Sequence, residues 1–451
     1  EVTEAALSRI ERFNPDLNAF LTITPERAMD RARLAEQAVM DGRDLGALHG
    51  VPTSIKDLED VDGVRITHGS AVNPQEVSMG DALCTERLES AGAILLGKTN
   101  TPEYGHAGTC DNLVGESCFN PWNPTHTSGG SSGGAASSVA AGMTAIAQGS
   151  DGGGSIRIPA SFCGVYGIKP TQGRVPRRIA GPSSWHPVNT SCVGPITRTV
   201  RDAALMLNVL SGPSADSEVN TIQESAPDFE QAVGRGVRGL RLAWSPDLGG
   251  ASVESIVASN VRSAAMEFDE LGAQVDETEF KLGEYEEVLE TFLTFFNVRG
   301  YSSYGHLLEN HADLLTPYFR DNLEAGREIA GSRFYSALSD ISRYRTYTAE
   351  FFKRYDLLLT PTVATTAFEV GNEPDTINGR SVKPRWGFLP FTYTFNMTGN
   401  PAATVPCGFS DDGMPMGLHI IGRMGDEETI LAASAAFEQA RPWIDNQPPI
   451  F

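Results

Sequence analysis

The sequence predicts an α/β protein with a mixed, mostly parallel central sheet covered by helices. Two observations carry this prediction. Short apolar runs read as buried strands at 93–96, 144–148, 163–168, 240–244, 356–360, 402–405 and 417–421. Helical patterns lie between them at 201–210, 254–271 and 428–440. Strands that alternate with helices are typical of this class.

The first helix is expected to begin at Pro25, because Thr24 and Pro25 combine a capping residue with a proline at the first helical position. Gly42 is expected to end it. The polar, acidic stretch 213–235 is interpreted as a surface connection between two halves. Aromatic residues are dense from 292 to 334, which favours helix core over the alternative of a substrate-pocket lining.

Composition excludes several classes of protein. The 451 residues are 40% hydrophobic, as expected for a folded protein with a large core. The net charge of −22 disfavours nucleic acid or an anionic membrane as a partner, and no apolar run is long enough to span a bilayer. Six sparse cysteines predict reduced, buried thiols in a cytoplasmic protein, with a Cys110–Cys118 bridge as the minor alternative. A removed leader stays open, because the chain begins at Glu1.

The unusual segment contains two glycine clusters, at 129–134 and 152–154. Such density indicates special backbone geometry or close approach to a ligand. A flexible linker is disfavoured because a helix-forming run and a core strand are expected to follow directly. A P-loop is excluded because Ala135 and Ala136 stand where lysine and Ser/Thr are needed. No dinucleotide-binding GxGxxG follows a strand here.

Residues 129–133 also match GxSxG, the nucleophile elbow of α/β hydrolases, with Ser131 as the nucleophile. That class needs a later histidine. None of the later histidines lies in an obvious catalytic turn, so this stays a minor alternative; they are His186, His306, His311 and His419.

Lysine is the other candidate base. Lys56 ends the short apolar run of GVPTSIKD at 50–57, a position that is often a solvated strand end. If it is buried beside serine hydroxyls, its pKa falls toward neutrality. A neutral amine can then take a proton from a serine and activate it.

Three motifs in this order resemble the amidase signature family of serine hydrolases: GVPTSIKD at 50–57, GGSSGG at 129–134 and SDGGGSIRIPA at 150–160. Supporting matches stand at 97–103, 120–122, 163–171 and 194–198. The resemblance implies one large domain over 1–451 with helices on both faces of the sheet. Its catalytic core is expected at about 45–210, and a C-terminal half at about 236–451 completes the sheet and substrate pocket.

The resemblance also implies roles. Lys56 is similar to the catalytic lysine, Ser131 to a bridging serine that follows a cis peptide bond, and Ser155 to the nucleophile. The expected oxyanion hole consists of the backbone N–H groups of Gly152, Gly153, Gly154 and Ser155. Gly152 departs from the Thr or Ile usual in the family, which puts any transfer of substrate size in doubt.

Other residues are implied in support. Ser132 resembles a partner of Lys56, and Asp151 and Arg157 resemble an ion pair that orients the loop. Gly105 and His106 are expected to line the substrate pocket. No metal or cofactor is expected.

The implied function is a stand-alone amidohydrolase that forms an acyl-enzyme, with carbamates and esters as possible further substrates and with aryl-acylamidase activity. Small, mainly neutral apolar or aryl amides are favoured, because no basic cluster beyond Arg174, Arg177 and Arg178 would bind a substrate carboxylate. One alternative is the glutamine-hydrolysing A subunit of a tRNA-dependent amidotransferase. Another is a catalytically degenerate binding protein. The protein is expected to be a monomer or homodimer.

Overall fold

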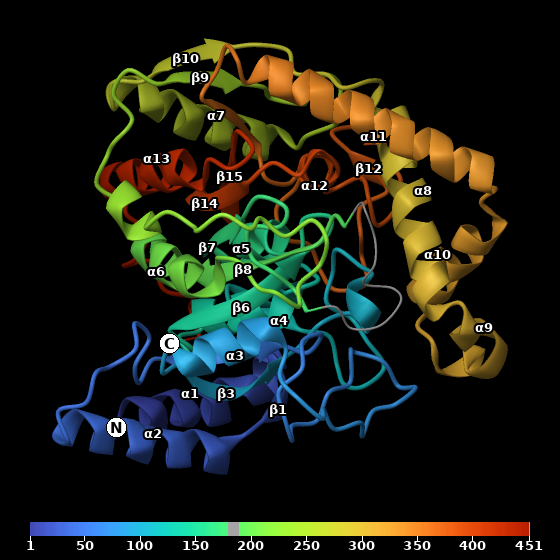
Figure 1. The fold of residues 1–451 in the computed structure, drawn as a ribbon. Coiled ribbons are helices and arrows are strands. Elements are labelled where there is room, and N and C mark those ends of the chain that lie inside the picture. Colours follow the sequence, from blue (N-terminus) through green and yellow to red (C-terminus); the bar gives the residue numbers. More distant parts are fainter. Residues whose placement is uncertain (179–188, 451) are drawn as a thin grey trace.

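An eleven-stranded sheet runs through the protein (Figure 1). The computed structural model describes residues 1–178 and 189–450. The strands of this sheet are, in chain order, β1 (Phe20–Ile23), β2 (Pro52–Lys56), β3 (Ile94–Thr99), β6 (Ile146–Asp151), β7 (Tyr166–Lys169), β8 (Cys192–Thr197), β9 (Arg241–Trp244), β10 (Gln274–Glu277), β11 (Leu357–Pro361), β14 (Ala402–Phe409) and β15 (Pro415–Gly422). Two small hairpins pair β4 (Phe119–Asn120) with β5 (Asn123–Thr127) and β12 (Thr376–Ile377) with β13 (Arg380–Ser381).

The other regular elements are mainly helices. They are α1 (Val2–Leu17), α2 (Pro25–Met40), α3 (Leu83–Ser90), α4 (Gly133–Ala140), α5 (Arg157–Cys163), α6 (Val200–Leu210), α7 (Ser255–Glu270), α8 (Tyr285–Tyr304), α9 (His306–Asn310), α10 (Pro317–Glu328), α11 (Gly331–Phe351), α12 (Tyr393–Thr398) and α13 (Glu427–Ala440). Short 3₁₀ turns occupy Glu103–Gly105, Phe229–Ala232 and Ala312–Leu314. None of the described helices combines the length and the apolar content that a membrane span requires.

The sheet is mixed. Its order is β1-β3-β2-β6-β8-β7-β14-β15-β11-β9-β10. The parallel pairs are grouped in two places, at β3-β2-β6 and at β11-β9-β10. The strands between these groups, and β1 at the edge, pair antiparallel. Antiparallel pairs are therefore more numerous than the sequence suggested, because β14 and β15 form a hairpin and β8 lies between β6 and β7.

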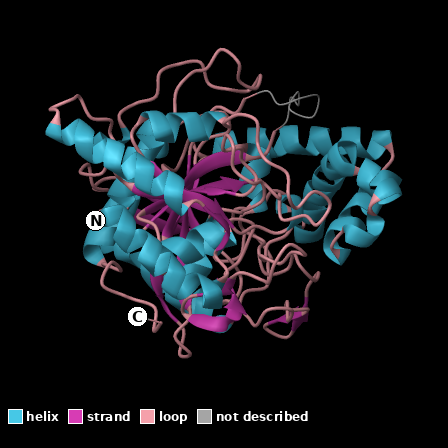
Figure 2. Ribbon diagram, turned by 90° about the horizontal axis from the view of Figure 1, so that it is seen from below, coloured by secondary structure: helices cyan, strands magenta, loops and turns pink. Residues whose placement is uncertain are grey.

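Helices cover both faces, as predicted. Side chains alternate along a strand, so Leu357 and Leu359 of β11 join a core with α6, α7 and α13, while Leu358 points to the opposite core with α11 and α12. Figure 2 shows the twisted strands in the middle with helices around them. In Figure 1 the N-terminal helices lie at the bottom beside β1 and β3, and β9 and β10 lie at the top.

Most predicted elements are confirmed. The helices expected at 201–210, 254–271 and 428–440 are α6, α7 and α13, and the first predicted helix is α2. The strand expected at 163–168 begins only at Tyr166, because Cys163 ends α5 and Gly164 turns the chain with φ of 66°. All six cysteines are buried and free, so the alternative Cys110–Cys118 bridge is wrong. Helix α1 was not predicted. Helices α8 and α10 and the start of α11 fall in or overlap the aromatic stretch 292–334, which was expected as helix core but without bounds for single helices.

Candidate active site

Lys56 ends β2 inside the protein, where its side chain is 0% exposed. Its Nζ donates to Ser131 Oγ at 2.6 Å and to Ser150 Oγ at 3.1 Å. The backbone N–H of Lys56 donates to the side-chain oxygen of Gln148 at 2.9 Å. The amine is therefore held between two hydroxyls, and the alternative of a solvated strand end is wrong.

Burial changes the charge of this amine. Desolvation disfavours the ammonium form and lowers the pKa of Lys56 to about 7. Neighbouring Cys110, Glu59 and Asp151 oppose the shift, and Arg177 adds to it. At neutral pH a substantial fraction of Lys56 is thus a neutral amine that can accept a proton.

Ser131 reaches Lys56 from the glycine loop between β5 and α4. The Gly130–Ser131 peptide bond is cis, as the resemblance predicted. The loop passes close to another backbone, since a Cβ at Gly130 would lie 2.1 Å from the carbonyl oxygen of Thr109. Glycine is therefore required at 130 to bring the Ser131 hydroxyl against the amine.

Ser132 supports Lys56 only indirectly. Within the described residues it makes no hydrogen bond to Lys56. Its Oγ instead donates to the carbonyl oxygen of Ser150 at 3.1 Å and accepts from the Ser150 N–H at 3.2 Å. Ser132 thus fixes Ser150, whose hydroxyl touches the amine. Sequence reasoning missed Ser150, although a hydroxyl directly before Asp151 in the third motif was the available signal.

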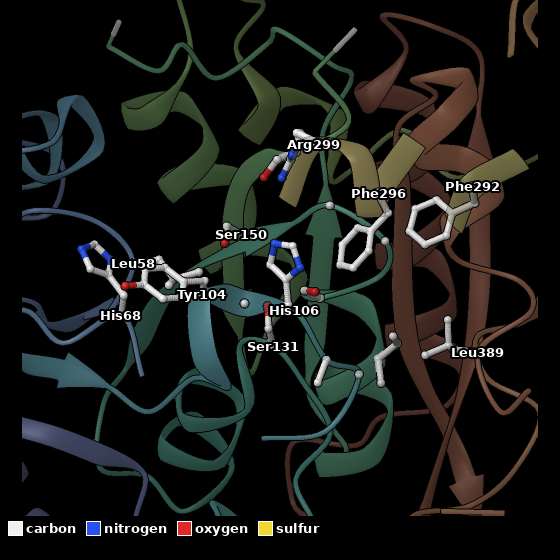
Figure 3. A pocket seen from close by; sticks show the side chains of 18 of the residues that line it. Leu58, His68, Tyr104, His106, Ser131, Ser150, Phe292, Phe296, Arg299 and Leu389 are labelled. Carbon is white, nitrogen blue, oxygen red and sulfur yellow. The ribbon is translucent and has the colours of Figure 1, made fainter. Parts of the chain in front are cut away.

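Ser155 lines the same cavity as Ser131. Figure 3 shows Ser131 close to His106 and Ser150 in this cavity. No hydrogen bond joins the two hydroxyls within the described part of the chain. A backbone bond does join the two loops, because Ser132 N–H donates to the Ser155 carbonyl oxygen at 3.0 Å. The structure therefore places Ser131 and Ser155 at one cavity and links Ser131 directly to the buried Lys56.

The expected oxyanion hole needs one correction. The N–H of Gly154 donates to Asp151 Oδ1 at 2.8 Å, so this group is already used inside the protein. The N–H groups of Gly152, Gly153 and Ser155 donate to no acceptor among the described residues. These three are the ones available to a ligand.

The glycine loop rests on a buried ion pair, as predicted. Arg157 Nε and Nη2 donate to the two oxygens of Asp151 at 2.8 and 2.9 Å, and both side chains are 0% exposed. Burial alone would raise the pKa of Asp151, but the charge and hydrogen bonds of Arg157 hold it well below its usual value. The carboxylate therefore stays ionised and orders the loop.

Residues far along the chain complete this brace, and sequence reasoning missed them. Asn396 of α12 accepts from Arg157 at 2.7 Å and donates to Asp151 Oδ1 at 2.9 Å. The hydroxyl of Thr392 donates to the Gly153 carbonyl oxygen at 2.7 Å. No motif signals these residues, because their role depends on α12 packing under the loop.

Gly105 and His106 line the cavity, as expected. Gly105 has φ of 72°, and a Cβ there would lie 3.3 Å from Ser131 Oγ. Their loop is tied to α10, because the carboxylate of Glu103 accepts from the backbone N–H and the hydroxyl of Thr316, both at 2.7 Å. The position of His106 is thus coupled to α10.

Some residues of the aromatic stretch 292–334 line the cavity, and others form helix core. Phe292 and Phe296 of α8 line the cavity, and Figure 3 shows their rings beside each other. Phe295 of the same helix and Phe334 of α11 pack together away from it. Trp386 and Leu389 extend the apolar wall.

The three arginines singled out from the sequence lie in different surroundings. Arg174 pairs with Glu427, and Arg178 pairs with Glu86 and Asp216. Arg177 lines the cavity and pairs with Glu59 at 2.9 Å. Arg299 of α8 lines the cavity too. Sequence reasoning missed Arg299, which stands in a mostly apolar and aromatic helix.

The nucleophile-elbow alternative lacks a histidine partner for Ser131 among the described candidates. His419 is buried in β15, with Nε2 3.0 Å from Arg157 Nη1. His306 begins α9 and His311 directly follows it, and neither lines the cavity. His186 lies outside the described residues.

Comparison with known proteins agrees with the geometry. The amidase family profile matches residues 1–431. An acylamidase of Rhodococcus erythropolis is 38% identical over 99% of this chain and 93% of its own length. The A subunit of the glutamyl-tRNA(Gln) amidotransferase of Thermosynechococcus vestitus is 34% identical over 100% of this chain and 96% of its own.

Solved structures give the same result. A bacterial aryl acylamidase of the amidase signature family superposes with a TM-score of 0.92 at 33% identity, covering 98% of this chain and 93% of the other. A 6-aminohexanoate cyclic dimer hydrolase superposes with a TM-score of 0.87 at 29% identity, covering 100% and 95%. This chain therefore belongs to the amidase signature family and is an amidase, a hydrolase of amide C–N bonds.

Proposed function

We propose that this amidase is a stand-alone hydrolase of small aryl or apolar amides that acts through an acyl-enzyme on Ser155. The observation that carries the proposal is the 2.6 Å hydrogen bond between Lys56 Nζ and Ser131 Oγ inside a buried site. A buried amine with a pKa of about 7 is suited to act as a base.

In the proposed relay, neutral Lys56 takes the Ser131 proton while Ser131 takes the proton of Ser155. Ser155 then attacks the amide carbonyl. The leaving amine receives the proton through Ser131, and water hydrolyses the acyl-enzyme by the same route. Because no hydrogen bond joins Ser131 to Ser155 in the free site, the relay needs the Ser155 hydroxyl to rotate toward Ser131 on substrate binding. Catalytic hydrogen bonds often tighten only in the complex.

The developing oxyanion would be bound by the N–H groups of Gly152, Gly153 and Ser155. Gly154 contributes rigidity instead, because its N–H is held by Asp151. Preorganised donors of this kind stabilise the charge that appears in the transition state.

The substrate class is supported by the apolar wall of Phe292, Phe296, Trp386 and Leu389. An aryl ring can stack or meet these rings edge to face. The similarity to an acylamidase and to an aryl acylamidase favours the same class. Carbamates and esters are further candidates, since the same acyl transfer would handle them.

The two halves of the chain have different proposed roles. The region 45–210 supplies the relay and the glycine loop. The C-terminal half, 236–451, supplies the apolar wall and the brace from α12. We propose a cytoplasmic monomer or homodimer that acts on small molecules without a cofactor or a nucleic-acid partner.

The direct test is release of aniline from acetanilide by the purified chain alone. We expect turnover that Ser155→Ala and Lys56→Ala each abolish, and labelling of Ser155 by a fluorophosphonate probe. A correctly folded Lys56→Ala protein with wild-type turnover would overturn the relay.

The similarity to the A subunits of amidotransferases supports a second candidate, a glutaminase that works in a complex. It predicts glutamine hydrolysis that rises on addition of the other components of such an enzyme, and no turnover of anilides. A folded protein that binds amides but neither turns them over nor reacts with the probe would instead be a degenerate binding protein.

A further inference from the structure

One wall of the cavity is cationic. Arg299 enters from α8 and lies above His106 in Figure 3, on the side away from Phe292 and Leu389. A polar end and an apolar end therefore share one cavity. Such an arrangement suits a substrate with a polar group at one end.

Arg299 has no carboxylate partner within 4 Å among the described residues. Its one hydrogen bond to a described residue is from Nη1 to Asn189 Oδ1 at 3.4 Å. Glu218 lies nearby, but it accepts from Asn189 Nδ2, and Glu59 pairs with Arg177. Burial lowers the pKa of Arg299, and the charge of Arg177 lowers it further.

The undescribed residues offer no carboxylate side chain. Residues 179–188 read IAGPSSWHPV and contain neither Asp nor Glu. The other undescribed residue is Phe451, whose side chain carries no carboxylate. A guanidinium that is partly desolvated without a counter-charge in contact favours an anionic ligand.

His106 provides an independent second observation. It is 5% exposed, and its Nδ1 is buried without a hydrogen-bond partner among the described residues. Its ring is held by Phe296 and Phe319, at centroid distances of 4.5 and 5.0 Å, and by Gly300, where a Cβ would lie 2.7 Å from the ring. Because protein encloses Nδ1, the ring nitrogen that can meet a ligand in the cavity is Nε2, which also has no hydrogen-bond partner among the described residues.

We propose that Arg299 and His106 form a subsite for a carboxylate on the substrate. The inference rests on the proposed amide hydrolysis and refines its substrate class. The substrate is an amphipathic amide, with an apolar or aryl part against Phe292 and Phe296 and a carboxylate at Arg299. The guanidinium offers two parallel N–H donors, which match a carboxylate. Burial lowers the pKa of His106 to about 3, so its ring is neutral and can donate one further hydrogen bond.

This subsite revises the expectation of mainly neutral substrates. That expectation depended on the absence of a basic cluster in the sequence. Arg299 is more than a hundred residues from Arg177 in sequence, so the two could be placed at one cavity only in the folded protein.

Two matched substrate pairs test the proposal, one for each side of the scissile bond. On the acyl side, 4-anilino-4-oxobutanoate is compared with N-phenylpentanamide. On the amine side, N-acetyl-4-aminobenzoate is compared with N-acetyl-4-methylaniline. We expect kcat/KM to favour the carboxylate in at least one pair by about tenfold or more, as charge-assisted hydrogen bonds to a buried arginine provide.

Variants then assign that preference. Arg299→Met is expected to reduce the carboxylate-to-neutral ratio by about tenfold, and Arg299→Lys, which keeps the charge without the fork, to reduce it less. Arg327→Met, an exposed arginine of α10, is the matched control and should keep the ratio. A wild-type preference for the neutral member of both pairs, or an Arg299→Met ratio equal to the wild type, would overturn the subsite.

Binding separates this proposal from the hydrolytic one. Calorimetry with Ser155→Ala protein measures the affinity for the two carboxylate compounds without turnover, and the Ser155→Ala/Arg299→Met protein is expected to bind the preferred one about tenfold more weakly. Arg299-dependent binding without wild-type turnover would sustain the subsite and overturn the hydrolysis. Turnover of the amides without a preference for the carboxylate compounds would sustain the hydrolysis and overturn the subsite. If the Arg299→Met protein fails to fold, the Arg299→Lys protein provides the test. An unchanged carboxylate-to-neutral ratio in Arg299→Lys would overturn the role of the two parallel guanidinium N–H donors.

Discussion

The Gly154 N–H donates to Asp151 Oδ1 at 2.8 Å, which closes the glycine loop onto the carboxylate that Arg157 holds in place. The loop is therefore not a flexible ribbon of glycines. Its shape is set by a buried charge, and the N–H groups on either side of Gly154 are left to face the cavity.

The first prediction concerns the buried ion pair. Asp151→Asn leaves Arg157 charged and buried without its counter-ion, and breaking such a pair costs about 3–5 kcal/mol of the free energy of unfolding. Urea denaturation measures this loss. The value of kcat is expected to fall with it, because one amide oxygen cannot replace the two carboxylate oxygens that accept from Gly154, Ile156 and Arg157. Glu277→Gln removes a carboxylate from the exposed pair with Arg262 and should cost less than about 1 kcal/mol. Equal losses in the two variants would contradict the structural role of Asp151.

The second prediction concerns pH. Lys56 can act as a base only when it is neutral, and its pKa is about 7. Values of kcat/KM should therefore rise with pH and level off above about 7, because protonation below that value removes the base. Lys56→Arg keeps a positive charge at every pH of the experiment, so it should lose activity throughout. An activity that is flat from pH 5 to 9 in the wild type would contradict the role of Lys56.

The third prediction compares two glycines of one loop. A Cβ at Gly152 would meet nothing closer than Ser191 at 3.8 Å, whereas a Cβ at Gly154 would lie 2.3 Å from Thr392 Oγ1. Gly154 also has φ of 131°, which side chains rarely adopt. Gly154→Ala should therefore reduce kcat and the melting temperature more than Gly152→Ala does. The room at 152 agrees with the Thr or Ile that the family usually carries there.

The sequence could single out the residues of the proposed relay because each of them stands inside a local motif. Lys56, Ser131 and Ser155 are each flanked by residues whose pattern is visible without a structure. The same holds for the sheet, since strands such as β9 and β11 are short apolar runs bounded by polar residues.

The walls of the site could not be predicted in this way. Asn396 meets Arg157 across 239 residues, and no local pattern of the sequence encodes that contact. The sequence analysis also expected one donor too many in the oxyanion hole. The path of the loop decides whether the Gly154 N–H donates to Asp151 or to a ligand, and the sequence does not show that path. Arg299 was missed because a helical pattern does not show which face meets the cavity.

The fourth prediction concerns Ser150, whose hydroxyl accepts from Lys56 Nζ at 3.1 Å. A hydroxyl oxygen stabilises the ammonium form, so its removal in Ser150→Ala should lower the pKa of Lys56 further. The rising limb of the pH profile should then move to lower pH while activity above that limb changes less.

Ser132→Ala provides the comparison, because Ser132 binds the backbone of Ser150 rather than the amine. It should disturb the position of Ser150 and so reduce kcat with a smaller displacement of the limb. A limb that moves to higher pH in Ser150→Ala would show that this hydroxyl does not stabilise the charged amine.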